Sequence, residues 1–245
     1  MRAVILAGGK GTRLAPYTSV LPKPLLPIGD RAILEIVVEQ LVATGFTQLT
    51  FCVGYLSHLI QALFNSGDGR GVKIDYVRER EPLGTAGPLR LASGLDETFL
   101  VMNGDVLTKL DYADLVRYHA ESGNALTIAT HARTVKIDYG VLHLDGESRL
   151  HAYDEKPEIP MVVSMGIYIL EPRVLEYIPA DVHFDFPDLV RKLLEAGEPS
   201  GSYSYDGFWL DIGRHEDYEQ ATSAWEAVTA NGSAVAPGVH TPISS

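Results

Sequence analysis

The fold is decided by the stretch Ala3-Val4-Ile5-Leu6-Ala7-Gly8-Gly9-Lys10-Gly11-Thr12-Arg13-Leu14. Its apolar run is short and rich in Val, Ile and Leu, as is typical of a buried parallel strand. The glycines that follow let the backbone turn tightly and present bare N–H groups to an anion. Arg13 and, in the stretch Pro22-Lys23-Pro24-Leu25-Leu26-Pro27, Lys23 add full positive charge. This pattern predicts a polyphosphate site at the start of an α/β domain.

Two better-known phosphate loops do not match this stretch. A Walker A loop needs a glycine five residues before the Gly-Lys pair and a Ser or Thr directly after it. Val4 and Gly11 occupy those two positions. A dinucleotide fingerprint needs a third glycine where Leu14 stands. A turn that only joins a strand to a helix would not explain the two cations behind it.

Composition narrows the class of protein. The chain has 245 residues and a net charge of −12, which argues against general nucleic-acid binding. No apolar stretch approaches the ~20 residues that span a bilayer, so we expect no membrane partner. Because the predicted first strand begins at Arg2, we expect no signal peptide. Cys52 is the single cysteine, so we expect a buried thiol, no internal disulfide and a cytoplasmic location. The eight histidines show no metal-ligand spacing.

Hydrophobic periodicity alternates between strand and helix in the first half of the chain. Alternation of this kind predicts an α/β fold, a Rossmann-like and mostly parallel sheet flanked by helices, with ligands at the carboxyl ends of the strands. Asp111 is the expected N-cap of the last helix in this half. The predicted strands are 2–7, 48–53, 73–77, 98–102 and 125–130, and the predicted helices are 32–43, 57–64, 86–95 and 112–122.

The second half reads as strand-rich and is expected to form a lobe that closes over the ligand. We expect one domain over 1–228, made of the half with the phosphate site at 1–135 and the strand-rich half at 136–228. Residues 229–245 read as a mobile tail. Within that tail, 234–239 looks like a single turn of a hexapeptide β-helix, which cannot fold alone. The predicted strands here are 140–143, 149–155, 164–170, 202–205 and 208–211, with helices at 187–196 and 215–228.

Two aspartates end predicted strands beside glycines: Asp105 after Asn103-Gly104, and Asp211 in Phe208-Trp209-Leu210-Asp211-Ile212-Gly213. Two carboxylates near a triphosphate make a hard oxygen site suited to Mg²⁺, which keeps water and phosphate oxygens as its other ligands. A third charged cluster, Asp154-Glu155-Lys156-Pro157, is held extended by its proline, and from its residues alone a solvated surface pair is the simpler interpretation.

Taken together, these motifs resemble the sugar-1-phosphate nucleotidyltransferases, the nucleotide-sugar pyrophosphorylases. The resemblance covers residues 1–227 and is strongest to guanylyltransferases that act on mannose 1-phosphate or heptose 1-phosphates. It implies a GT-A-like nucleotidyltransferase fold, with Mg²⁺ as cofactor and a possible homodimer. It also implies that 1–135 is the nucleotide-binding half and 136–228 the sugar-phosphate half. The matching elements are LAGGKGTRL, LPKPLLPI, EPLGTAGPL, NGD, YGV, EKP, GIY and FWLDIG.

The resemblance also implies roles for single residues. Arg13, Lys23 and Lys156 would be catalytic, and Asp105 with Asp211 would hold Mg²⁺. The sugar phosphate would be bound by Asn103, Gly140, Glu155, Lys156 and Gly166. The nucleotide would be bound by Leu6, Ala7, Gly8, Gly9, Gly11, Thr12, Arg13, Glu81, Gly84 and Thr85.

Glu81 indicates which base is bound. Many thymidylyl- and uridylyl-transferring relatives look to have glutamine at this position. A carboxylate only accepts hydrogen bonds, and guanine offers it two adjacent donors, N1–H and the 2-amino group, whereas thymine and uracil flank one donor with acceptors. We therefore expect GTP, unless Glu79 faces the base in place of Glu81.

The implied reaction is in-line attack of a sugar 1-phosphate on the α-phosphorus of the nucleotide, with pyrophosphate leaving. Alternatives are the same reaction with UTP, dTTP or ATP and a glucose-type phosphate, or a regulatory subunit that binds a nucleotide sugar without turnover. A glycosyltransferase is a further alternative, but its Asp-x-Asp metal motif is missing, because Asn103-Gly104 precedes Asp105.

Overall fold

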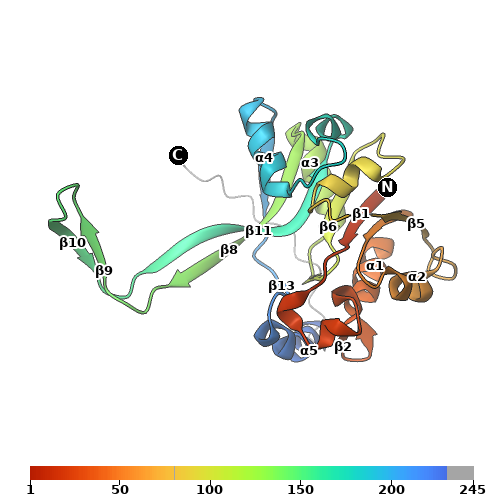
Figure 1. Cartoon of the computed structure of the whole chain (residues 1–245), viewed down its shortest axis with the longest axis horizontal. Helices are drawn as coiled ribbons and strands as arrows, with labels where there is room; N and C mark the ends of the chain where they lie inside the picture. Colours follow the sequence, from red (N-terminus) through yellow and green to blue (C-terminus); the bar gives the residue numbers. More distant parts are fainter. Residues whose placement is uncertain (80, 231–245) are drawn as a thin grey trace.

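The computed structural model describes residues 1–79 and 81–230. Residues 231–245 of the predicted tail, with its hexapeptide turn, lie outside the described residues. A seven-stranded sheet in the order β12-β8-β11-β6-β1-β4-β5 forms the centre of the molecule (Figure 1). Its strands are β1 (Arg2–Ala7), β4 (Gln48–Val53), β5 (Lys73–Arg78), β6 (Phe99–Asn103), β8 (Leu126–Lys136), β11 (Glu158–Leu170) and β12 (Ser200–Ser204).

Neighbouring strands of this sheet pair in parallel except at β11, which runs antiparallel to both β6 and β8. The predicted α/β class with a mostly parallel sheet is therefore confirmed. Two short strand pairs lie outside this sheet: β2 (Pro27–Ile28) with β3 (Arg31–Ala32), and β7 (Val106–Thr108) with β13 (Trp209–Asp211). Within the described residues, no helix has the length and apolar character needed to cross a membrane.

The sheet is buried on both faces. Side chains of β1 alternate between two cores, with Ala3, Ile5 and Ala7 in one and Val4 in the other. The first core takes side chains from α1 (Ile33–Ala43), α2 (Ser57–Phe64), α3 (Tyr112–Ser122) and α5 (His215–Ala230). The second takes them from α4 (Phe186–Glu195) and from the 3₁₀ helices η4 (Gly87–Leu91) and η5 (Pro172–Tyr177). Such double burial explains the continuous apolar runs in the sequence.

The helices predicted for 57–64 and 112–122 have those bounds in the structure, and Asp111 caps α3 by accepting the backbone N–H groups of Ala113 and Asp114 at 2.9 and 3.1 Å. The helix predicted for 86–95 is wrong: only the 3₁₀ helix η4 forms there. Ala92 already has extended backbone angles, and Gly94 turns with φ +70°. The chain therefore turns away before an α-helix develops.

An arm projects from one side of the sheet (Figure 1). The strands predicted for 125–130 and 164–170 are longer than expected, because β8 and β11 continue as a two-stranded ribbon beyond the sheet. The hairpin of β9 (Val141–Leu144) and β10 (Leu150–Asp154) lies at its end. We call residues 132–164 the arm. It points away from the body, so the predicted lobe does not close over the carboxyl edge of the sheet, and the expected boundary at 135/136 falls within β8.

Where the arm meets the body, β11 changes register. Between Ser164 and Tyr168 the pairing of β11 with β8 shifts by a bulge. Gly166 lies in that bulge with φ +73°, which a glycine adopts without strain.

Candidate functional site

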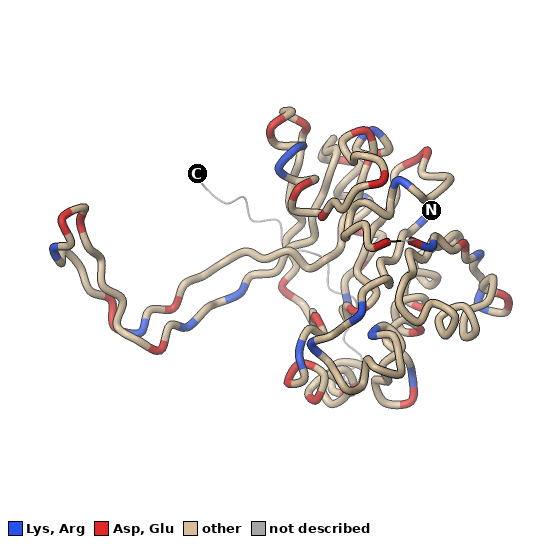
Figure 2. The backbone as a smooth tube through the Cα atoms, in the orientation of Figure 1, with Lys and Arg blue, Asp and Glu red and all other residues tan. Residues whose placement is uncertain are grey.

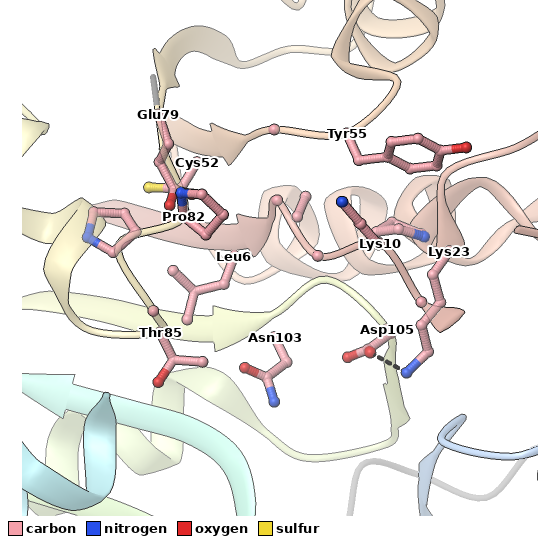
Figure 3. Close-up of a pocket in the computed structure, with 18 of the residues that line it drawn as sticks. Leu6, Lys10, Lys23, Cys52, Tyr55, Glu79, Pro82, Thr85, Asn103 and Asp105 are labelled. Atoms are coloured by element: carbon pink, nitrogen blue, oxygen red, sulfur yellow. Dashed lines mark hydrogen bonds and ion pairs between the residues drawn. The ribbon is translucent and has the colours of Figure 1, made fainter. Parts of the chain in front are cut away.

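A cavity of about 710 Å³ opens at the carboxyl ends of β1, β4, β5 and β6, where the fold class predicts ligands (Figure 3). Most of the residues predicted to bind the nucleotide line it. The glycine loop, the segment after β5 and the turn after β6 therefore meet at this cavity. The predicted residues that line it are Leu6, Ala7, Gly8, Gly9, Gly11, Arg13, Glu81, Gly84 and Thr85, together with Lys23, Asn103 and Asp105. Thr12 is not among the lining residues; it is exposed in the 3₁₀ helix η1 (Thr12–Leu14). The roles of all these residues stay predictions.

Two close approaches shape the glycine loop. A Cβ on Gly54 would lie 2.7 Å from the carbonyl oxygen of Gly8, so the loop after β4 is pressed directly against the loop after β1. Gly11 has φ +61°, and a Cβ there would lie 2.9 Å from the Thr18 side chain. The loop is thereby held in one shape against its neighbours, as a preformed anion cradle requires.

Lys23 and Asp105 form an ion pair at the floor of the cavity (Figure 3). Both side chains are mostly buried, at 13% and 20% exposure. Lys23 comes from the 3₁₀ helix η3 (Lys23–Leu25), and Asp105 from the turn after β6. Oxygen Oδ2 of Asp105 accepts from Lys23, whereas its buried Oδ1 has no hydrogen-bond partner among the described residues. An unpartnered buried carboxylate oxygen is costly unless a ligand or ion satisfies it.

Asp211 is brought beside Asp105 by strand pairing. In the antiparallel pair of β13 with β7, Asp211 lies opposite Val106, the residue after Asp105. Asp211 reaches solvent, yet its surroundings remove part of its hydration, and this desolvation together with the negative charge of Asp105 raises its pKa. Lys23 and Arg13 oppose that rise. The two carboxylates predicted to share a cation are therefore close enough for the charge of Asp105 to act on Asp211.

These residues fit a divalent cation. Among residues 1–79 and 81–230 there is no cluster of three or more His, Cys, Asp or Glu side chains suited to a metal. One or two carboxylates completed by phosphate oxygens and water is the coordination that Mg²⁺ prefers. The unpartnered Oδ1 of Asp105 and the mutual repulsion with Asp211 supply the unmet negative charge that such an ion would neutralise.

The segment expected to face the base is fixed to the start of α4. Backbone and hydroxyl groups of Thr85 both donate to Oδ1 of Asp185, at 2.8 and 3.0 Å, and the N–H of Phe186 donates to the Thr85 hydroxyl at 2.9 Å. Glu79 accepts the N–H of Leu83 at 2.8 Å, and its partial burial raises its pKa. Glu81 is exposed at the same cavity.

A second cavity of about 530 Å³ adjoins the first and shares Arg13 with it. It is lined by Asp211 and by two arginines that the sequence did not single out, Arg133 from β8 and Arg214 after β13. Lys10 and Arg78, in the first cavity, were also missed as site residues. Their positions in the sequence could have identified them, because Arg78 directly follows a predicted strand at the ligand edge and Lys10 lies within the glycine loop.

The remaining sugar-phosphate residues fall into two places. Gly166 packs on Asn103, where a Cβ would lie 2.6 Å from its side-chain nitrogen, so it lies next to the first cavity. Gly140, Glu155 and Lys156 are exposed on the arm, and neither cavity includes them. The structure therefore does not bring these three residues to the phosphate loop of their own chain.

Comparisons with known proteins agree with this geometry. The family model described as "Nucleotidyl transferase" matches residues 2–227. The chain is 36% identical to a UTP–glucose-1-phosphate uridylyltransferase of Synechocystis sp., covering 99% of this chain and 69% of that protein. It is 35% identical to the catalytic subunit beta of a mannose-1-phosphate guanylyltransferase of Danio rerio, covering 89% of this chain and 62% of that protein.

Solved structures share the fold. A Bacillus anthracis protein in complex with sucrose superposes with a TM-score of 0.74 at 24% identity, over 91% of this chain and 94% of that one. HddC from Yersinia pseudotuberculosis, complexed with GMP-PN, gives a TM-score of 0.68 at 27% identity, over 91% and 99% of the two chains. The first likeness concerns the fold alone.

Proposed function

The chain belongs to the nucleotidyl transferase family, and we propose that it transfers a guanylyl group from GTP to a mannose- or heptose-type sugar 1-phosphate, releasing pyrophosphate. The predicted family and enzyme class are confirmed by the match over residues 2–227. The nucleotide, the sugar and Mg²⁺ are proposals, since the chain spans only 62–69% of the relatives named above.

The observation that carries the proposal is the convergence of the glycine loop, Arg13, Lys23 and the two aspartates at one sheet edge. Loop N–H groups and Arg13 would hold the triphosphate, and Lys23 would neutralise charge that builds up at the reacting phosphate. Asp105 and Asp211 would hold Mg²⁺, which when bound supplies positive charge to the phosphate oxygens. The attacking phosphate is already ionised, so no general base is needed, and the chain contributes mainly positioning.

Guanine is supported by the state of the two glutamates. Glu79 already accepts a backbone N–H from Leu83, whereas Glu81 stands exposed at the cavity and offers two carboxylate oxygens. Such an acceptor complements the paired donors of guanine. The guanylyltransferase of Danio rerio and the complex of HddC with GMP-PN add support from relatives.

A second candidate is transfer from UTP to glucose 1-phosphate, favoured by the 36% identity to the Synechocystis uridylyltransferase. The test is a pyrophosphate-release assay of GTP, UTP, dTTP, ATP and CTP against hexose and heptose 1-phosphates. We expect the highest kcat/KM with GTP. A preference for UTP with glucose 1-phosphate would favour the second candidate, and no release with any pair would favour the regulatory alternative.

A further inference from the structure

The arm has no core of its own. From Ala132 to Ser164, every residue is exposed or only partly covered. A two-stranded ribbon with both faces in water is marginally stable at best. Figure 2 shows the arm reaching away from the body as a long, thin loop of chain. We therefore expect another protein surface to cover the arm and stabilise it.

One face of the arm's hairpin is apolar. Leu142 pairs with Tyr153, and Leu144 with Leu150, so these four side chains share a face of the β9–β10 pair. Each is between 53% and 57% exposed. Along the ribbon, Ile159 pairs with Val135, and both are also exposed. Exposed apolar side chains clustered on one face, as on this hairpin, are typical of an interaction surface.

At the base of the hairpin, the Glu155 carboxylate has a defined partner. The Tyr153 hydroxyl donates to it, and a Cβ on Gly140 would overlap that hydroxyl. Lys156 has φ +46°, so the extended conformation expected before Pro157 is wrong. The backbone is left-handed there, and for a non-glycine residue such conformations are concentrated at functional sites.

The body of the chain has an open cavity that the hairpin of the same chain does not cover. The cavity beside Asp211 carries Arg13, Arg133 and Arg214, and no residue of the hairpin lines it. Each chain therefore presents one uncovered arm and one open cavity lined by arginines.

The hairpin lies away from its own cavity. β8 and β11 pair continuously from the ribbon's outer end, Lys136 with Glu158, down to Ser164 with Thr130 at the sheet. This paired ribbon separates the hairpin from the body, and no residue of the hairpin lines either cavity. A second copy related by a two-fold axis satisfies both arms and both cavities at once with the ribbons extended as they are.

We propose that two copies of this chain exchange arms, and that Glu155 and Lys156 of one copy complete the sugar-phosphate side of the other copy's site. Each active site is then built from two chains: the glycine loop and aspartates of one, and the hairpin base of the other. This inference rests on the proposed function for the roles of Glu155 and Lys156, but the exchange itself rests on the arm.

The decisive experiment is complementation between two inactive variants. Asp105→Asn inactivates the body of a chain, and Lys156→Ala inactivates its arm. A homodimer of either variant therefore has two inactive sites. The two variants are co-expressed with different tags and purified through both, and an untagged equal mixture is assayed in parallel. Random pairing gives about a quarter of wild-type sites, because half the dimers are mixed and each mixed dimer has one undamaged site. Purified mixed dimers should reach about half the wild-type turnover.

If the arm served its own chain, no mixture would exceed the activity of the separate variants, and the proposal would be overturned. Sedimentation equilibrium tests the exchange without any activity. The wild type should be a dimer, and the double variant Leu142→Glu with Leu150→Glu should be a monomer. Leu194→Glu, at an exposed leucine on α4, is the matched control and should stay dimeric.

A monomeric wild type would refute the exchange whatever its activity. A dimer that needs the arm but releases no pyrophosphate with any substrate pair would support the exchange and reject the proposed function. Because the substituted leucines are already exposed, loss of the dimer in that variant does not reflect a collapsed core.

Discussion

At the scale of single residues, the site is an arrangement of charges that the protein alone leaves unbalanced. Oδ1 of Asp105 is buried without a partner, and Asp211 is held close enough for the two carboxylates to repel. Such groups destabilise the folded protein by themselves. Their arrangement makes sense if a cation and a polyphosphate supply the missing partners.

Removing the charges at the floor of the cavity should abolish turnover. We expect Asp105→Asn and Lys23→Ala each to lower kcat by about 100-fold or more at saturating Mg²⁺, the scale of a lost electrostatic stabiliser. The matched control is Lys73→Ala, because Lys73 is an exposed lysine at the amino end of β5, on the opposite edge of the sheet. Near-wild-type turnover in either cavity variant would refute the assigned role.

Glu81→Gln should change base preference. An amide presents a donor where the carboxylate presents only acceptors, so kcat/KM for GTP should fall and that for UTP or dTTP should rise. We expect the ratio to shift by about tenfold, equivalent to ~1.4 kcal/mol. Steady-state kinetics with both nucleotides measure it. If Glu79→Gln shifts the ratio and Glu81→Gln does not, Glu79 is the residue that reads the base.

At the scale of elements, local patterns predicted the parallel half of the molecule well. β1, β4, α2 and α3 have the predicted bounds, because each has a buried face and a clear start or stop. The segment 86–95 failed because its apolar spacing resembles a helix, whereas Pro88 and Gly94 and the attachment of Thr85 to Asp185 favour a 3₁₀ turn. That attachment joins residues far apart in the chain and is invisible to local periodicity.

Packing between two loops predicts the effect of Gly54→Ala. The added Cβ would collide with the carbonyl of Gly8, so the glycine loop must shift. Overpacking of this kind costs about 1–3 kcal/mol in the free energy of unfolding. We expect KM for the nucleotide to rise with a smaller change in kcat, as measured by initial rates and urea unfolding. Gly146→Ala, where a Cβ meets nothing within 4 Å, is the control.

His119 on α3, which contacts Thr127 of the sheet, should make the stability of the fold depend on pH. His119 is buried; its Nδ1 lies 2.7 Å from the Thr127 hydroxyl and its Nε2 lies 3.2 Å from Glu171. Desolvation lowers the pKa of His119, partly offset by Glu171. The unfolded chain therefore takes up a proton near pH 6.5 that the folded chain does not, so the free energy of unfolding should fall as pH drops below about 6.5. His119→Gln should flatten that slope in urea titrations, and an unchanged slope would contradict the assignment.

At the scale of the whole molecule, the sequence predicted which segments are strands in the second half but not where they go. Alternating apolar residues over 141–163 are equally compatible with a lobe packed on the body and with a free ribbon. The long-range pairing of β8 with β11 decides between them, and it is a property of the folded chain. For the same reason Gly140, Glu155 and Lys156 could be recognised by motif while their position relative to the phosphate loop could not.

Ligand binding should stabilise the whole chain in a metal-dependent way. At a nucleotide concentration 100 times Kd, the expected gain is about 2.7 kcal/mol. For a chain of this size that corresponds to a rise in Tm of about 5–10 °C with GTP and Mg²⁺. Thermal unfolding with EDTA in place of Mg²⁺ should show a smaller rise, and Asp105→Asn should show equal rises in both conditions. Equal rises in the wild type would exclude a role for the cation in nucleotide binding.

The position of the register bulge at Gly166 has a consequence for how the arm and the first cavity are connected. It lies at the root of the arm and packs directly on Asn103 at the floor of the first cavity. Because the ribbon is long, a small change of backbone angle at Gly166 would displace the hairpin much farther than it displaces the root. Through the contact with Asn103, the same change would also alter the wall of the first cavity.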